Sequence, residues 1–111
     1  MPGRTKGRAK IDFHGRPFVW WIDGDYYLRI ASLDKRFVVA YALGCAIDQP
    51  PILTVYGQEF TGLDPSEARP IYVIVSEPVG DSMGACVNHL LTWSFDPSHA
   101  LVKADGPPRF S

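Results

Sequence analysis

The chain has 111 residues, of which 46% are apolar and 21% charged, a composition that fits one globular domain with a packed core. No stretch reaches the eighteen or so uninterrupted apolar residues of a membrane helix, and the N-terminus has charges where a signal peptide needs apolar residues. We therefore predict a cytoplasmic protein that has no membrane partner. The net charge of −1 excludes a strongly basic domain of the kind that coats nucleic acid.

The charge is unevenly distributed. Residues 1–16 have five basic residues against one acidic residue, a net charge of +4, so residues 17–111 have −5. The basic residues are Arg4, Lys6, Arg8, Lys10 and Arg16. Because this segment has little to bury, we predict that residues 1–12 are a flexible, disordered basic tail. The alternative is a basic arm that binds nucleic acid, which the acidic remainder of the chain disfavours.

Five β-rich runs follow, separated by turn signals and with no helical pattern between them. The runs are 17–22, 26–31, 36–43, 52–56 and 71–76. The connections offer no helix for parallel crossovers, so the runs predict a five-stranded antiparallel meander. Both faces of such a sheet would be rich in apolar residues. The sheet must then curl strongly, pair with a second copy or receive a ligand.

The first hairpin concentrates aromatic residues around Asp23-Gly24. This dipeptide between two apolar runs predicts a two-residue turn, which would place Trp20 opposite Tyr27. Both rings would then lie on the sheet face away from Trp21, and Trp21 would face the core. We predict that the outer face binds a partner. Its predicted binding residues are Phe18, Trp20, Tyr27 and Arg29.

The period of the apolar residues changes after Gly80. Steps of three and four residues predict a helix that either Asp81 or Ser82 caps and that Asp96-Pro97 ends. The apolar positions are Met83, Cys86, Val87, Leu90, Leu91 and Phe95. We predict that this helix packs across the sheet, so that residues 13–100 form a single α+β domain and residues 101–111 a C-terminal tail.

Patterns typical of catalysis are sparse. His14, His89 and His99 have no spacing that would collect a metal ion, and we predict neither a metal nor a cofactor. Ser82 stands where a strand-to-helix turn is predicted, so it could be a nucleophile with His89 or His14 as its base. A serine that only caps the helix explains the same position without any chemistry.

The sequence therefore predicts a small non-enzymatic binding or interaction module of unknown ligand, homodimeric through an apolar sheet face. Besides a second copy of the chain, the partner predicted for this module is an unidentified protein or small molecule. One alternative is a small hydrolase-like enzyme that uses Ser82 with His89 or His14. Another is nucleic-acid binding through the basic tail and the aromatic sheet face, although only one arginine lies among those aromatic residues.

Overall fold

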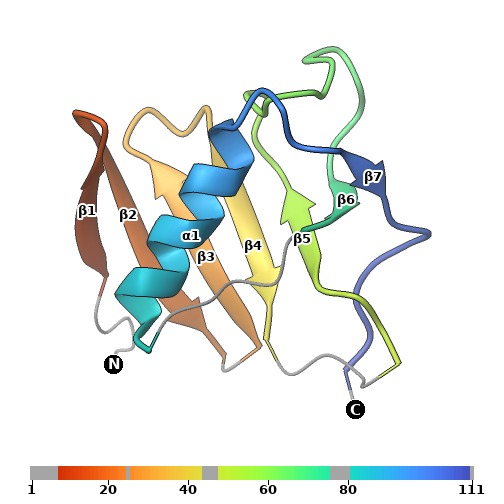
Figure 1. Ribbon diagram of the computed structural model, residues 1–111, viewed down its shortest axis with the longest axis horizontal. Helices are drawn as coiled ribbons and strands as arrows, with labels where there is room; N and C mark the ends of the chain where they lie inside the picture. The colour runs from red at the N-terminus through yellow and green to blue at the C-terminus, as the bar shows by residue number, and fades with distance from the viewer. Residues whose placement is uncertain (1–7, 25, 44–47, 76–80, 111) are drawn as a thin grey trace.

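The computed structural model describes residues 8–24, 26–43, 48–75 and 81–110. Within these residues it contains seven strands and one helix (Figure 1). They are β1 (Ala9–Phe13), β2 (Arg16–Asp23), β3 (Tyr27–Ser32), β4 (Val38–Ala42), β5 (Ile52–Val55), β6 (Ile71–Ile74), α1 (Met83–Phe95) and β7 (Val102–Lys103). The order of the strands in the sheet is their order in the chain, and all neighbours are antiparallel.

The α+β class, the antiparallel meander and the C-terminal helix are confirmed, and each of the five predicted runs overlaps a strand. The sheet has two further strands, one at each edge. β7 lies in the predicted C-terminal tail, and β1 includes residues 9–12 of the predicted N-terminal tail, so both tail predictions are wrong there. Residues 1–7 of the predicted basic tail lie outside the described residues.

β1 forms because its residues alternate between the two faces of the sheet. Ile11 and Phe13 pack against the core, whereas Lys10 and Asp12 are exposed. The turn that follows has φ angles of 52° at His14 and 81° at the next residue, a glycine, as in a two-residue hairpin turn that requires positive φ at both positions. β1 is therefore paired along its whole length with β2.

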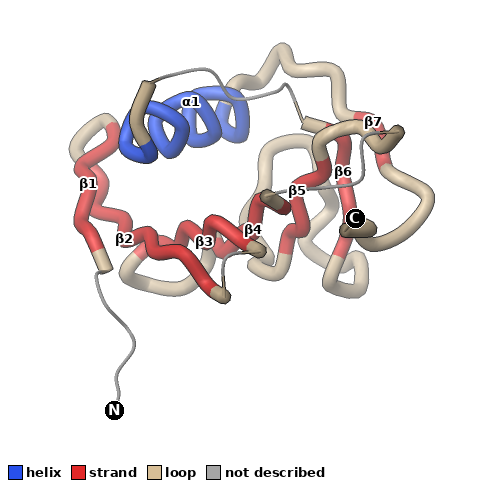
Figure 2. Tube along the Cα trace, turned by 90° about the horizontal axis from the view of Figure 1, so that it is seen from below, coloured by secondary structure: helices blue, strands red, loops and turns tan. Residues whose placement is uncertain are grey.

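Helix α1 covers one face of the sheet. Figures 1 and 2 show it lying across β1 to β4, with the sheet curved towards it. Its buried residues Val87, Leu90 and Leu91 complete a core that also receives side chains from β2 to β6. The helix begins after Ser82, whose hydroxyl oxygen accepts a hydrogen bond from the amide of Ala85 (3.1 Å), as expected for a cap.

The predicted pairing of β2 with β3 is wrong. Trp20 is opposite Ile30, not opposite Tyr27, and Trp21 is opposite Arg29. The register thus differs by three residues from that of a two-residue turn at Asp23-Gly24. Because side chains alternate between faces, an odd shift moves every side chain of β2 to the other face of the sheet.

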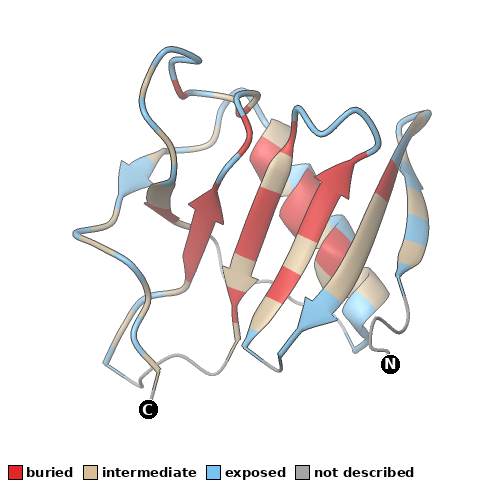
Figure 3. Cartoon of the chain, turned by 180° about the vertical axis from the view of Figure 1, so that it is seen from behind, coloured by how far each residue is buried: buried red, intermediate tan, exposed pale blue. Residues whose placement is uncertain are grey.

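The shift places Phe18 and Trp20 on the face that α1 covers. Phe18 is 1% exposed, and its ring packs edge to face against Phe37 with centroids 5.7 Å apart. Trp20 is half-buried against the same core. Tyr27 and Arg29 of β3 do lie on the predicted outer face, and Arg29 is opposite Ala40 of β4 on the face away from α1. We call this the open face (Figure 3).

Candidate functional site

The four predicted binding residues do not share a face. Phe18 and Trp20 point into the core under α1, whereas Tyr27 and Arg29 lie on the open face. The structure thus brings Tyr27 and Arg29 together on the open face and separates them from Phe18 and Trp20. A binding role for Tyr27 and Arg29 stays a prediction.

Aromatic rings and guanidinium groups alternate around these two residues. We define the arginine-aromatic cluster as Arg8, Trp21, Tyr27, Arg29 and Tyr56. The Arg8 Cζ atom lies 4.0 Å from the centroid of the Trp21 ring. The Arg29 Cζ atom lies 5.3 Å from the centroid of Tyr27 and 5.6 Å from that of Tyr56. All three distances fall within the range of cation–π attraction.

The register of the sheet builds this cluster. Trp21 of β2 is directly opposite Arg29 of β3, and Arg29 is directly opposite Ala40 of β4. Because the alanine side chain is small, the arginine has room to extend over it, and Ala40 is fully buried. The Nε atom of Arg29 also donates a hydrogen bond to Asp23 (2.7 Å), which orients the guanidinium.

Four members of the cluster remain accessible to solvent, and the fifth, Tyr27, is half-buried with its ring edge to face against Phe110 (5.6 Å between centroids). Arg8 is exposed, Trp21 and Arg29 are half-buried, and Tyr56 is 39% exposed. Figure 3 shows that no described helix or strand passes over β1 to β4 on this side. The open face thus presents flat rings and planar cations that are already held in position, which suits contact with a planar or anionic partner.

Sequence reasoning missed three members of this cluster. Trp21 was assigned to the core because the turn was taken to have two residues. Arg8 was assigned to the tail, although the alternation that begins at Ala9 could have placed it beside β2. Tyr56 follows β5, and no signal in the sequence shows that it lies near Arg29.

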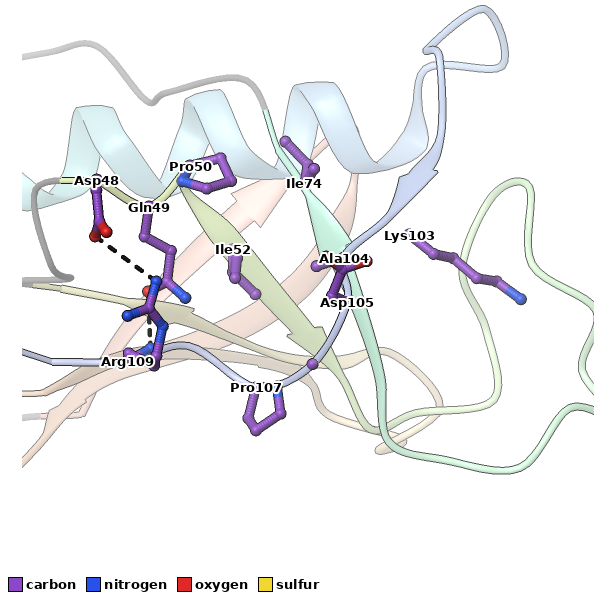
Figure 4. A pocket seen from close by; sticks show the side chains of 11 residues that line it. Asp48, Gln49, Pro50, Ile52, Ile74, Lys103, Ala104, Asp105, Pro107 and Arg109 are labelled. Atoms are coloured by element: carbon purple, nitrogen blue, oxygen red, sulfur yellow. Dashed lines mark hydrogen bonds and ion pairs between the residues drawn. The ribbon is translucent and has the colours of Figure 1, made fainter.

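The C-terminal segment borders a hollow of about 410 Å³ over β5 and β6 (Figure 4). Ile52 and Ile74, which are opposite each other on the open face, contribute to its wall. The backbone amide of Arg109 donates a hydrogen bond to the side-chain oxygen of Gln49 (2.7 Å), and its guanidinium lies 3.7 Å from Asp48. The polar groups at this end therefore already interact with one another.

The enzyme alternative has little geometric support. The Ser82 hydroxyl is engaged as the cap of α1. His14 lies at the β1–β2 turn with its ring stacked on Phe13 (4.2 Å between centroids), and His89 lies on α1 with a buried Nε2 atom that has no hydrogen-bond partner in the described part of the chain. The described contacts thus do not join Ser82 to either histidine.

His14 lines a second, smaller hollow of about 250 Å³ together with Phe13, Arg16, Phe18 and Phe95. The charge in this hollow is already neutralised. The two terminal nitrogens of Arg16 donate to the two carboxylate oxygens of Glu59 (2.9 and 2.8 Å), and one also donates to Asp34 (3.4 Å). We interpret this group as a structural ion pair that ties β2 to the segment after β5.

The ion pair predicts a pH dependence of stability. The hydrogen bonds from Arg16 lower the pKa of the Glu59 carboxyl below its usual value, against the opposing effect of burial. A lowered pKa stabilises the fold above the ordinary glutamate pKa of about 4.3 and ceases to do so as the pH falls below it. Glu59→Gln should therefore lower the free energy of unfolding by about 1 kcal/mol at pH 7.

Urea denaturation at a series of pH values tests this prediction. The difference in the free energy of unfolding between wild type and Glu59→Gln should disappear as the pH falls below the pKa of an ordinary glutamate. Asp105→Asn is the control, because it removes the same charge from an exposed position in the C-terminal segment. A Glu59→Gln penalty that is the same at pH 3 and pH 7 would contradict the role of the ion pair.

The described residues contain no group of three or more histidine, cysteine, aspartate or glutamate side chains that could hold a metal ion. No helix in the same part of the chain is long and apolar enough to cross a membrane. Comparisons with family models, with curated proteins and with solved structures found no match.

Proposed function

We propose that the protein is a small non-enzymatic interaction module and that the open face of its sheet is the binding surface. The observation that carries this proposal is the arginine-aromatic cluster, which stays accessible on the one sheet face that α1 does not cover. Tryptophan, tyrosine and arginine are the residue types that contribute most to binding energy at protein interfaces. The cluster combines all three.

The two faces of the sheet differ in the size of their buried side chains, and this difference supports the proposal. The face under α1 contains the fully buried side chains of Leu28, Ile30 and Val39, so the core is complete without the cluster. On the open face the buried side chains are mostly small, such as Ala31 and Ala40. Large, orientable groups above a layer of small ones form a surface that a partner can contact without disturbing the core.

A second copy of the chain is one partner that fits this surface. Val19 and Trp21 on β2 and Val38 on β4 are half-buried on the open face and supply apolar area for a homodimer. A stable dimer needs about 1,600 Å² of buried surface in total. We therefore keep the homodimer as a proposal, to be tested together with the surface itself.

Trp20→Ala and Trp21→Ala test the surface as a matched pair. Trp20→Ala should lower the free energy of unfolding by about 2 kcal/mol, because the ring packs against the core. Trp21→Ala should cost clearly less, since it removes one cation–π contact and a half-buried ring on the open face. Urea denaturation of both variants measures the difference.

Light scattering of the same variants at micromolar concentration measures association. If the homodimer forms through the open face, Trp21→Ala should reduce the measured mass to that of one chain while the fold remains intact. If Trp21→Ala destabilised the fold as much as Trp20→Ala does, the cluster would be part of the core and the proposed binding surface would be wrong.

A further inference from the structure

We infer that single-stranded nucleic acid is the ligand of the open face, with its bases stacked on the arginine-aromatic cluster. The inference rests on the proposed function, because it names the partner of the same surface. Bases in a single strand expose flat faces and a regularly spaced negative charge. The cluster and the strand beside it match both features.

Stacking surfaces are the first of the two features. Trp21 has the guanidinium of Arg8 over its ring, and Arg29 lies between the rings of Tyr27 and Tyr56. Bases stack on aromatic rings and equally on the planes of arginine guanidinium groups. A base can therefore stack on an aromatic ring or on a guanidinium group, and in both cases an arginine adds a cation–π attraction.

The cluster is wide enough for more than one base. It extends from β2 to Tyr56, which directly follows β5. Neighbouring strands lie about 4.8 Å apart, so the distance from β2 to β5 is roughly 14 Å. This distance is about four times the rise of roughly 3.4 Å between stacked bases. A short segment of single strand can thus lie across the strands of the sheet.

Positive charge is the second feature, and it lies at one side of the cluster. Arg8 and Lys10 are exposed at β1, and their positions alternate with Ala9 so that both belong to the open face. The residues that precede Arg8 include Arg4 and Lys6 and no acidic residue. The sequence on this side of the cluster is therefore basic.

The same charges disfavour the second copy as the occupant. A two-fold symmetric interface places the same patch of both subunits against itself. Arg29 is paired with Asp23, but the exposed positive side chains of Arg8 and Lys10 would then approach those of the other copy, and like charges in an interface are unfavourable. A phosphate backbone has the opposite charge. The chemistry of the open face therefore favours a nucleic acid strand.

Fluorescence anisotropy of labelled oligo-dT and oligo-U of about twelve nucleotides tests the inference on the full-length chain at low salt. Trp21→Ala should weaken binding about tenfold or more, since it removes a stacking surface. The control is Arg36→Ala, which removes one exposed arginine from the loop between β3 and β4 and should change the affinity little. A duplex of the same length should bind more weakly, because its bases are stacked inside the helix.

The salt dependence distinguishes phosphate contacts from stacking. Lys10→Ala should lower the slope of log K against log salt concentration by about 0.7, the value for one phosphate contact to a single strand. Trp21→Ala should weaken binding without changing this slope. Circular dichroism of every variant confirms that the fold is retained, so that a loss of affinity reports on the surface.

Two outcomes would overturn the inference. Absence of binding to either single strand at low salt is one, and binding that Trp21→Ala and Lys10→Ala leave unchanged is the other. If either occurs while Trp21→Ala still abolishes a dimer seen by light scattering, the open face is a binding surface for a second copy, and only the choice of ligand is wrong. If Trp21→Ala unfolds the chain, the proposed function fails with it.

Discussion

Phe18→Ala should lower the free energy of unfolding by about 3 to 5 kcal/mol, the cost of removing a large ring from a close-packed core. The Phe18 side chain is 1% exposed and packs against both Phe37 and Phe95, with ring centroids 5.7 and 6.0 Å apart. Phe37 and Phe95 are themselves stacked at 4.9 Å. The substitution therefore leaves a cavity that joins β2, the loop before β4 and the end of α1.

The control for this experiment is Val19→Ala in the same strand. Val19 is half-buried on the open face, so its loss should cost much less than that of Phe18. Urea denaturation of the two variants gives the order of their stabilities. The sequence alone predicted the reverse, with Phe18 outside and Val19 inside. A larger penalty for Val19→Ala would restore that assignment and contradict the register of β2.

The hairpin shows why the sequence predicts an element better than its orientation. Both strands and the turn at Asp23-Gly24 were predicted correctly, but Asp23 is opposite Tyr27, so the loop has three residues. An aspartate-glycine pair indicates a turn without determining its length, and each change in register by an odd number reverses a face. Tyr27 and Arg29 of β3 nevertheless lie on the face away from the core, as predicted, because only the side chains of β2 changed face relative to β3.

A signal for the correct register was present in the sequence. With the observed pairing, Asp23 and Arg29 lie on the same face and form an ion pair of 2.7 Å, while Phe18, Leu28 and Ile30 share the other face. On the face of Arg29, the observed register leaves two apolar residues of β2, Val19 and Trp21, where the predicted register would leave three, Phe18, Trp20 and Ile22. The difference in apolar content between the two faces of the sheet predicts the register better than the turn dipeptide does, because burial of the apolar face selects the register.

Helix α1 was predicted almost residue by residue, since a cap, an apolar period and a stop are all local signals. The candidate site was not, because it depends on contacts between distant parts of the chain. Arg8 reaches Trp21 only through the pairing of β1 with β2, and Tyr56 reaches Arg29 only through β4 and β5. Such contacts follow from the register of several strands, and an error in one register changes the whole set.

Gly57 holds the segment after β5 against the loop before β4. The amides of Tyr56 and Gly57 both donate to the carbonyl oxygen of Val38 (2.9 and 3.1 Å), and Gly57 is buried. A Cβ atom on Gly57 would clash with the carbonyl oxygen of Arg36 and would lie 2.7 Å from the amide nitrogen of Val38. Both are backbone atoms, so neither can rotate away as the end of a side chain can.

Gly57→Ala should therefore lower the free energy of unfolding by about 3 kcal/mol or more, at the upper end of the cost of overpacking. The control is Gly106→Ala, because a Cβ atom there has nothing within 4 Å; its effect should stay within about 0.5 kcal/mol. The segment that Gly57 holds includes Tyr56, so Gly57→Ala should also disturb the Tyr56 side of the arginine-aromatic cluster. Equal urea midpoints for the two glycine variants would contradict the close approach, and with it the position of Tyr56 beside Arg29.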